Sequence, residues 1–224
     1  MPLYIVATPI GNLGDISPRA LDCLRNADVV LCEDTRQTIK LLNHYEIKVT
    51  TLSYHQHSTA TKVNEIRALL DEGQKVALVS DAGTPGISDP GNRLIADLVA
   101  QDPELVVSPL PGASAMISAL SVSGFPTDRF SFRGFPPHKK GRQTYFRELG
   151  ESNDTIVFYE SNHRIEKCLQ ELSGVLQPHR QVMIARELSK QFESIYRGTM
   201  AELLNKKIPP KGEFVVVISK NYDK

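Results

Sequence analysis

Short apolar runs and longer amphipathic stretches alternate along the first half of the chain. In the stretch 58–71, for example, Val63, Ile66 and Leu70 recur at intervals of three and four, which is typical of a helix. The pattern predicts strands at 3–8, 28–33, 49–54, 75–80 and 104–109, and helices at 18–26, 35–44, 58–71 and 91–101. Strands that alternate with helices in this way indicate a parallel sheet.

The pattern changes after residue 110. A helix is predicted to open at "PGASA" (111–115), and strand-like runs follow at 129–135, 155–160, 180–187, 192–199 and 213–219. Because only a short connection joins the runs 180–187 and 192–199, at least one antiparallel pair is predicted. The alternating Phe130 and Phe132 are predicted to be core residues of the first run.

These patterns predict an α/β protein with two α/β domains and a cleft between them. Residues 1–110 are expected to form an N-terminal domain with a parallel sheet. Residues 111–224 are expected to form a C-terminal domain with a mixed sheet.

Composition excludes several classes of protein. Of 224 residues, 41% are apolar and 23% are charged, which is ordinary for a globular chain. No apolar run approaches the ~20 residues that span a bilayer. The N-terminus "MPLYIVATPIG" has neither a basic leader nor a long apolar segment, so no signal peptide is expected. Cys23, Cys32 and Cys168 are widely spaced, which predicts reduced thiols in a cytoplasmic protein and no metal site.

The two halves of the chain differ in charge although the net charge is zero. Residues 1–110 carry 9 Lys/Arg and 14 Asp/Glu, a balance of −5, and residues 111–224 carry 17 and 12, a balance of +5. A solvated surface could account for this difference. The asymmetry also predicts that the second half meets an anionic partner.

The segment richest in turn-forming residues is "SDAGTPGISDPG" (80–91), which directly follows a predicted strand. Ligands of parallel sheets lie outside the carboxyl ends of strands, and glycine lets the backbone approach them closely. A solvent-exposed turn has the same composition. A second such loop, "SPLPGASA" (108–115), follows the next strand and favours a ligand site. Since no GxGxxG, GxxxxGK[ST] or HExxH motif is present, the residues alone predict a small polar cofactor of unspecified kind.

Seven segments together carry a resemblance to a known family. They are "LYIVATPIGNLGDIS" (3–17), "CEDTR" (32–36), "VSDAGTPGISDPG" (79–91), "LPGASA" (110–115), "FRGFPPHKKGR" (132–142), "FYESNHR" (158–164) and "ARELSKQFE" (185–193). In this order they resemble the ribosomal RNA small-subunit methyltransferase I family, a branch of the tetrapyrrole methylase superfamily. The resemblance implies S-adenosylmethionine (SAM)-dependent 2′-O-methylation of a decoding-centre cytidine in 16S rRNA of the 30S subunit. It also implies a cytoplasmic homodimer with SAM in the cleft between its domains.

The resemblance implies specific cofactor residues. SAM is expected against Asp81, Gly83, Thr84, Pro85 and Gly86 of the first loop and Pro111, Gly112, Ala113, Ser114 and Ala115 of the second. Further contacts from the backbone are implied near Tyr159, Glu160, Ala185 and Gly212. The chain ends at "EFVVVISKNYDK" without the small helical extension that many members carry, and whether this weakens ribosome binding stays open.

A basic segment is the candidate RNA contact. Residues 129–147 contain six Lys/Arg and no acidic residue, with five aromatic residues interleaved. Cations that bind phosphates beside aromatic faces are typical of single-stranded RNA binding. The predicted RNA-binding residues are Lys139, Lys140, Arg142 and, from a later motif, Arg164.

Methyl transfer to a ribose hydroxyl needs a base or a cation that stabilises the nascent alkoxide. The predicted catalytic residues are Arg186, Glu187 and Lys190, and which of the candidate groups removes the proton stays open. Glu187 and Lys190, three apart, could also form an ordinary surface pair.

Two alternative functions stay open from the sequence. One is methylation of a tetrapyrrole carbon by an enzyme of the same superfamily, because a carboxylate-rich precorrin also suits a basic cleft. The other is a non-catalytic RNA-binding or ribosome-assembly factor. The intact glycine loops argue against the second alternative.

Overall fold

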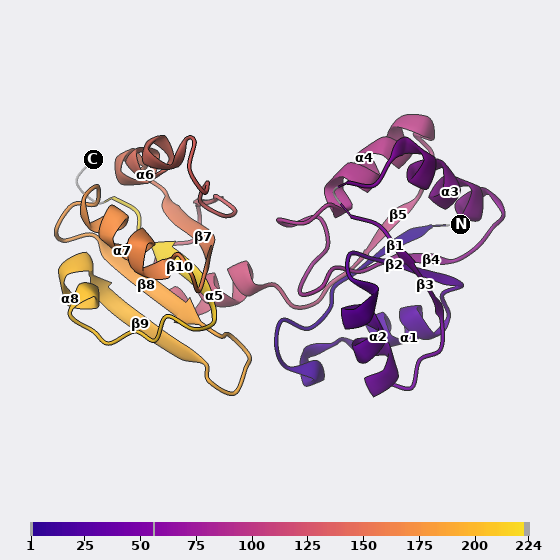
Figure 1. Ribbon diagram of the computed structural model, residues 1–224, viewed down its shortest axis with the longest axis horizontal. Coiled ribbons are helices and arrows are strands. Elements are labelled where there is room, and N and C mark those ends of the chain that lie inside the picture. The colour runs from indigo at the N-terminus through magenta and orange to yellow at the C-terminus, as the bar shows by residue number, and fades with distance from the viewer. Residues whose placement is uncertain (1, 56, 222–224) are drawn as a thin grey trace. The chain divides into compact units, whose positions relative to one another are not determined.

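The computed structural model describes residues 2–55 and 57–221, which divide into two compact units, Met1–Ser114 and Ala115–Lys224 (Figure 1). The sequence pattern places the division after residue 110. Residues 111–114 fall in the first unit, where the hydroxyl of Thr84 donates a hydrogen bond to the carbonyl of Ala113 at 3.1 Å. The loop after the last strand of this unit is therefore tied back to it.

The first unit contains a parallel five-stranded sheet in the order β3-β2-β4-β1-β5. Its strands are β1 (Leu3–Val6), β2 (Val29–Cys32), β3 (Thr50–Ser53), β4 (Val76–Leu78) and β5 (Val107–Leu110). All four pairings are parallel, so the predicted parallel sheet is confirmed. The central strands β2 and β4 are buried at every position, as expected when helices cover both faces.

Helices cover both faces of this sheet (Figure 1). They are α1 (Pro18–Arg25), α2 (Thr35–His44), α3 (Ala60–Asp71) and α4 (Gly91–Gln101), with a short 3-10 turn η1 (Leu13–Asp15) before α1. Leu24 of α1 and Leu42 of α2 belong to the same core as Val30, whereas Ile66 of α3 and Leu98 of α4 share a core with Leu31. Because successive strand residues point to opposite faces, Val30 packs against α1 and α2, and Leu31 packs against α3 and α4.

The strand order reverses between β1 and β4. The chain leaves β1 for α1 on one face and leaves β4 for α4 on the other, so their carboxyl ends form a topological switch point, where ligands of open α/β sheets bind. Both predicted ligand loops, which follow β4 and β5, lie at this edge of the sheet.

The second unit has a five-stranded mixed sheet in the order β6-β7-β10-β8-β9. Its strands are β6 (Phe130–Phe132), β7 (Thr155–Ser161), β8 (Gln181–Arg186), β9 (Ser194–Thr199) and β10 (Glu213–Ile218). Only β6–β7 is parallel among the described pairings. The mixed sheet is confirmed, and the predicted antiparallel neighbours are β8 and β9.

One helix covers one face of the second sheet and three helices cover the other. Helix α5 (Ala115–Ser123) packs on one face, opposite α6 (Arg142–Glu151), α7 (Ile165–Ser173) and α8 (Met200–Leu204). The sequence pattern did not predict α7, although Ile165, Cys168 and Leu172 recur at helical spacing. It also did not predict α8, which has only five residues. None of the helices in the described part of the chain has the length and apolar content needed to cross a membrane.

The prediction that Phe130 belongs to the core is wrong. Its side chain is 39% exposed, while Phe132 is partly buried against the core below α5. Strand β6 has three residues and lies at the edge of the sheet. The alternation of phenylalanines in the sequence therefore did not ensure that the side chain of Phe130 is covered by other elements.

Candidate functional site

The loop after β4 has a defined conformation. Gly83 and Gly86 adopt φ of 81° and 87°, a region that residues with a Cβ rarely occupy. The Gly83 amide donates to the Thr8 carbonyl at 3.0 Å, and the Thr8 amide donates back to the Gly83 carbonyl at 2.9 Å. The Ser80 hydroxyl adds a hydrogen bond to the Gly83 carbonyl at 3.2 Å. These hydrogen bonds join the carboxyl ends of β1 and β4.

The loop after β5 meets the loop after β4. Thr84 of the first loop donates a hydrogen bond to Ala113 of the second. A Cβ on Gly112 would also lie 2.8 Å from the Cβ of Ala7, so only glycine lets the loop after β5 approach the end of β1 this closely. The structure therefore gathers nine predicted cofactor residues at one edge of the first sheet: Asp81, Gly83, Thr84, Pro85, Gly86, Pro111, Gly112, Ala113 and Ser114. The tenth loop residue, Ala115, is the first residue of α5 in the second unit.

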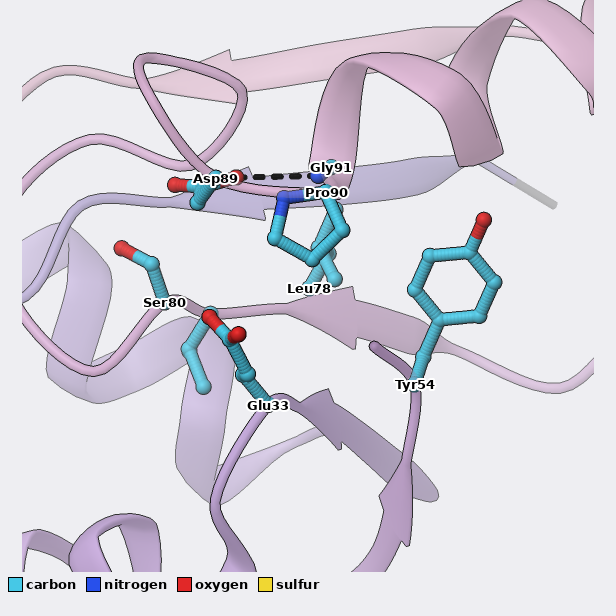
Figure 2. Close-up of a pocket in the computed structure, with 8 residues that line it drawn as sticks. Glu33, Tyr54, Leu78, Ser80, Asp89, Pro90 and Gly91 are labelled. Atoms are coloured by element: carbon cyan, nitrogen blue, oxygen red, sulfur yellow. Dashed lines mark hydrogen bonds between the residues drawn. The ribbon is translucent and has the colours of Figure 1, made fainter. Parts of the chain in front are cut away.

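A small pocket lies beside the first loop, lined by residues from the ends of β2 and β4 (Figure 2). Glu33, Ser80 and Asp89 contribute the polar groups, and Tyr54 lies near Pro90. One carboxylate oxygen of Asp89 accepts the amides of Gly86 at 2.6 Å and Gly91 at 2.9 Å, which closes the turn before α4. Sequence reasoning missed Glu33 and Asp89, although both stand in the segments "CEDTR" and "SDPG".

The electrostatics of this edge are acidic. Burial raises the pKa of Glu33, and the nearby carboxylates of Asp81 and Asp89 raise it further. Asp81 is anchored by the amide of Asp34, which donates to its carboxylate at 3.2 Å. Clustered carboxylates favour a ligand with a cationic group, such as an ammonium or a sulfonium, over a phosphate. Among residues 2–55 and 57–221, no group of His, Cys, Asp and Glu is placed to hold a metal ion.

In the second unit, the predicted catalytic residues meet the predicted Gly212. The Glu187 amide donates to the Glu213 carbonyl, and the Glu213 amide donates to the Glu187 carboxylate, both at 2.9 Å. The ammonium of Lys190 lies 3.1 Å from the Glu187 carboxylate and 3.0 Å from that of Glu213. A Cβ on Gly212 would lie 2.7 Å from Cγ of Glu187, and Arg186 donates to the neighbouring Lys211 carbonyl at 2.6 Å.

Glu187 and Lys190 both keep their charge near neutral pH. Burial acts to raise the pKa of Glu187, but the Glu213 amide and Lys190 outweigh it and hold that pKa below its ordinary value. Burial acts to lower the pKa of Lys190, but the carboxylates of Glu213 and Glu187 outweigh it and raise that pKa. A carboxylate with a lowered pKa is a weak base. The cluster therefore presents a fixed cation, Lys190, rather than a proton acceptor.

The remaining predicted cofactor residues of the second unit separate onto two faces. Tyr159 and Ala185 are both in register with Val215 and lie on the α5 face of the sheet. Glu160 follows Tyr159 on the strand and points to the opposite face, where its side chain is fully buried. The predicted contact near Glu160 is one from the backbone, and the buried side chain of Glu160 takes no part in it.

The predicted RNA-binding residues also separate. Lys139 and Lys140 are exposed in the loop before α6. Arg142 is only 4% exposed and is held by Glu171, with its Nε 2.9 Å from a carboxylate oxygen. Arg164 is mostly covered and pairs with Glu160 at 2.9 Å. The sequence predicts both arginines as RNA contacts, but in the structure their guanidinium groups are engaged by protein carboxylates. The charge pattern of a sequence does not show which cations are buried.

Comparison with known proteins identifies the family of this chain. Residues 2–204 match the model of the tetrapyrrole (corrin/porphyrin) methylases. The ribosomal RNA small subunit methyltransferase I of Synechocystis is 46% identical over 97% of this chain and 78% of its own length. The Thermotoga maritima protein of the same name is 44% identical over 97% of both chains. The chain belongs to the ribosomal RNA small subunit methyltransferase I family. Like other members of this family, it is a methyltransferase, as the resemblance of the seven motifs implies.

Solved structures agree with this fold. The methyltransferase CobJ aligns with a TM-score of 0.71 at 18% identity, over 98% of this chain and 94% of its own. A uroporphyrin-III-C-methyltransferase from Thermus thermophilus aligns with a TM-score of 0.64 at 19% identity, over 96% and 93%. At such identities the likeness concerns the fold alone. The family's two-domain α/β fold is therefore confirmed for this chain.

Proposed function

We propose that this methyltransferase transfers the methyl group of SAM to the ribose 2′-hydroxyl of cytidine 1402 in 16S rRNA. The observation that carries the proposal is the relationship to proteins named ribosomal RNA small subunit methyltransferase I, at 46% and 44% identity over 97% of this chain. The proposed substrate is the rRNA within the 30S subunit, and the proposed enzyme is a cytoplasmic homodimer that uses no metal.

The two glycine loops of the first unit are proposed to hold SAM. Positive-φ glycines at 83 and 86 and the close approach at Gly112 leave backbone groups free of side-chain cover. The carboxylates of Asp81 and Asp89 suit the ammonium and sulfonium charges of SAM. When bound, SAM supplies an activated methyl carbon, so the chain has only to position the acceptor and stabilise charge.

Lys190 is proposed to act on the acceptor hydroxyl. A ribose hydroxyl ionises far above neutral pH, so a fixed cation that stabilises the developing alkoxide lowers the barrier. Glu187 holds this cation by a 3.1 Å ion pair and is itself fixed by the Glu213 amide, which makes Glu187 a positioning residue. Tyr159, Glu160, Ala185 and Gly212 are kept as proposed cofactor contacts through their backbone.

Exposed cations before α6 are proposed to bind rRNA phosphates. We expect Lys139→Ala combined with Lys140→Ala to weaken binding of 30S subunits. Each lost phosphate contact should also lower the slope of log affinity against log salt by about one. Filter binding at several salt concentrations measures both effects. Lys40→Ala with Lys48→Ala, two exposed lysines of the acidic first unit, is the matched control. A wild-type slope in the Lys139/Lys140 variant would show that this loop does not contact phosphate.

The substrate class is tested by label transfer. The chain is incubated with methyl-labelled SAM and either 30S subunits from a strain that lacks the family's enzyme or a precorrin. We expect label in the RNA fraction only. Label in the precorrin alone would assign the chain to tetrapyrrole methylation. Binding of 30S subunits without SAM binding or transfer would favour a non-catalytic factor.

A further inference from the structure

Two arginines beside the basic loop, residues 133–141, face inward. The side chain of Arg142 is 5% exposed and that of Arg164 is 17% exposed, whereas Arg133, Lys139 and Lys140 of the loop itself are exposed. The covered pair and the exposed trio therefore have different roles, although the sequence presents all of them as one basic segment.

Each buried arginine donates a hydrogen bond to the backbone of the basic loop. Arg142 Nη1 donates to the carbonyl of Pro137 at 3.1 Å, and Arg164 Nη1 donates to the carbonyl of Pro136 at 2.9 Å. Proline has no amide hydrogen, so its carbonyl is the one backbone group through which such a residue can be hydrogen-bonded. The arginines thus bind two successive carbonyls in the middle of the loop.

Buried carboxylates keep the arginines in place. Glu160, with a side chain of 0% exposure, lies 2.9 Å from Arg164 Nη2 and 3.5 Å from Arg142 Nη2. Arg142 Nε also donates to both carboxylate oxygens of Glu171, at 3.1 and 2.9 Å. Moving either arginine towards solvent would leave Glu160 buried without its full counter-charge, which is strongly unfavourable.

The N-terminal end of the basic loop is also fixed. The Arg133 amide donates to the Val157 carbonyl at 2.9 Å, and the Tyr159 amide donates to the Gly134 carbonyl at 2.8 Å. Two arginines and two glutamates cancel in charge within the buried network. The outward positive charge of the loop therefore comes from its exposed Arg133, Lys139 and Lys140.

We propose that Arg142 and Arg164 are positioning residues that hold the basic loop in one conformation, so that its exposed cations meet the rRNA backbone without first being ordered. This inference rests on the proposed rRNA methylation. Ordering a flexible loop on binding costs conformational free energy, and a preformed loop avoids that cost. The arginines act on substrate affinity without touching the substrate.

The test uses Arg164→Lys, which keeps the charge. Lysine has a single terminal nitrogen and lacks the planar fork that reaches Glu160 and Pro136 together. We expect trypsin to cleave after Lys139 and Lys140 about tenfold faster than in wild type, and KM for 30S subunits to rise about tenfold. We expect kcat and KM for SAM to stay within about twofold of wild type. Glu171→Gln, which weakens the hold on Arg142, should change the same two quantities in the same direction.

The control is Arg147→Lys, since Arg147 is an exposed residue of α6 whose Nε lies 3.9 Å from the carboxylate of Glu151 on the same helix. Melting temperature and cleavage elsewhere in the chain distinguish general unfolding from loop opening. Wild-type cleavage rates in both variants, or a faster-cleaved loop with unchanged KM for 30S subunits, would overturn the inference. Absence of any transfer to 30S subunits by wild type would instead be a failure of the proposed function. The cleavage rates would then still decide whether the arginines hold the loop.

Discussion

A Gly83→Val variant is expected to lose SAM affinity by about a hundredfold or more. Gly83 has φ of 81°, and a β-branched residue is strained in that region, so the loop has to change its backbone conformation. Space is not the obstacle, because the nearest atom to a Cβ at this position would be 3.4 Å away, on Ile10. The reorganised loop would break the reciprocal hydrogen bonds with Thr8 and displace the backbone that is proposed to contact SAM. Calorimetry with SAM measures the loss.

Gly73→Val is the matched control for backbone strain. Gly73 has φ of 80° in the turn between α3 and β4, and a Cβ there would meet nothing within 4 Å. We expect both variants to melt at a slightly lower temperature, and only Gly83→Val to lose SAM affinity. Unchanged SAM affinity in Gly83→Val would contradict the proposal that this loop binds SAM. An equal loss in Gly73→Val would attribute the effect to general destabilisation.

A Lys190→Met variant is expected to lower the rate of methyl transfer by about a hundredfold to a thousandfold, the usual effect of removing one group that stabilises a developing oxyanion. SAM affinity should stay near the wild-type value, because Lys190 forms ion pairs with Glu187 and Glu213 of the second unit. Single-turnover kinetics at saturating 30S subunits isolates the chemical step.

Lys190→Arg and Lys211→Met complete this series. Arginine keeps a cation beside Glu187 and should recover part of the rate, whereas Lys211→Met removes an exposed cation nearby and should leave the rate unchanged. A Lys190→Met variant with the wild-type single-turnover rate and a raised KM for 30S subunits would assign Lys190 to phosphate binding instead of chemistry.

The periodicity of the sequence was sufficient to predict the first unit. Its central strands β2 and β4 are continuous apolar runs because helices cover both faces, and the helices between the strands show their own apolar spacing. The five-residue α8 carries no comparable signal. The position of Phe130 depended on the order of strands, which local spacing does not contain.

The loops of the site could be predicted because glycine and proline report backbone conformation directly. The buried network could not. Arg142 and Glu171 are far apart in the sequence and come into contact only because α6 packs beside α7. Glu160, on the neighbouring strand β7, lies 3.5 Å from Arg142. In the same way, the contact between Glu187 and Gly212 follows from the register of β8 and β10, in which Arg186 pairs with Phe214.

The position of the transferred methyl group tests the central claim most directly. The chain is incubated with methyl-labelled SAM and 30S subunits that lack the modification, the rRNA is digested to nucleosides, and the labelled nucleoside is identified by mass spectrometry and located by primer extension. The account predicts one labelled product, 2′-O-methylcytidine at position 1402, because in-line transfer needs the hydroxyl held about 3–3.5 Å from the methyl carbon. Label on a base carbon or nitrogen, or on the ribose of a different nucleotide, would contradict it.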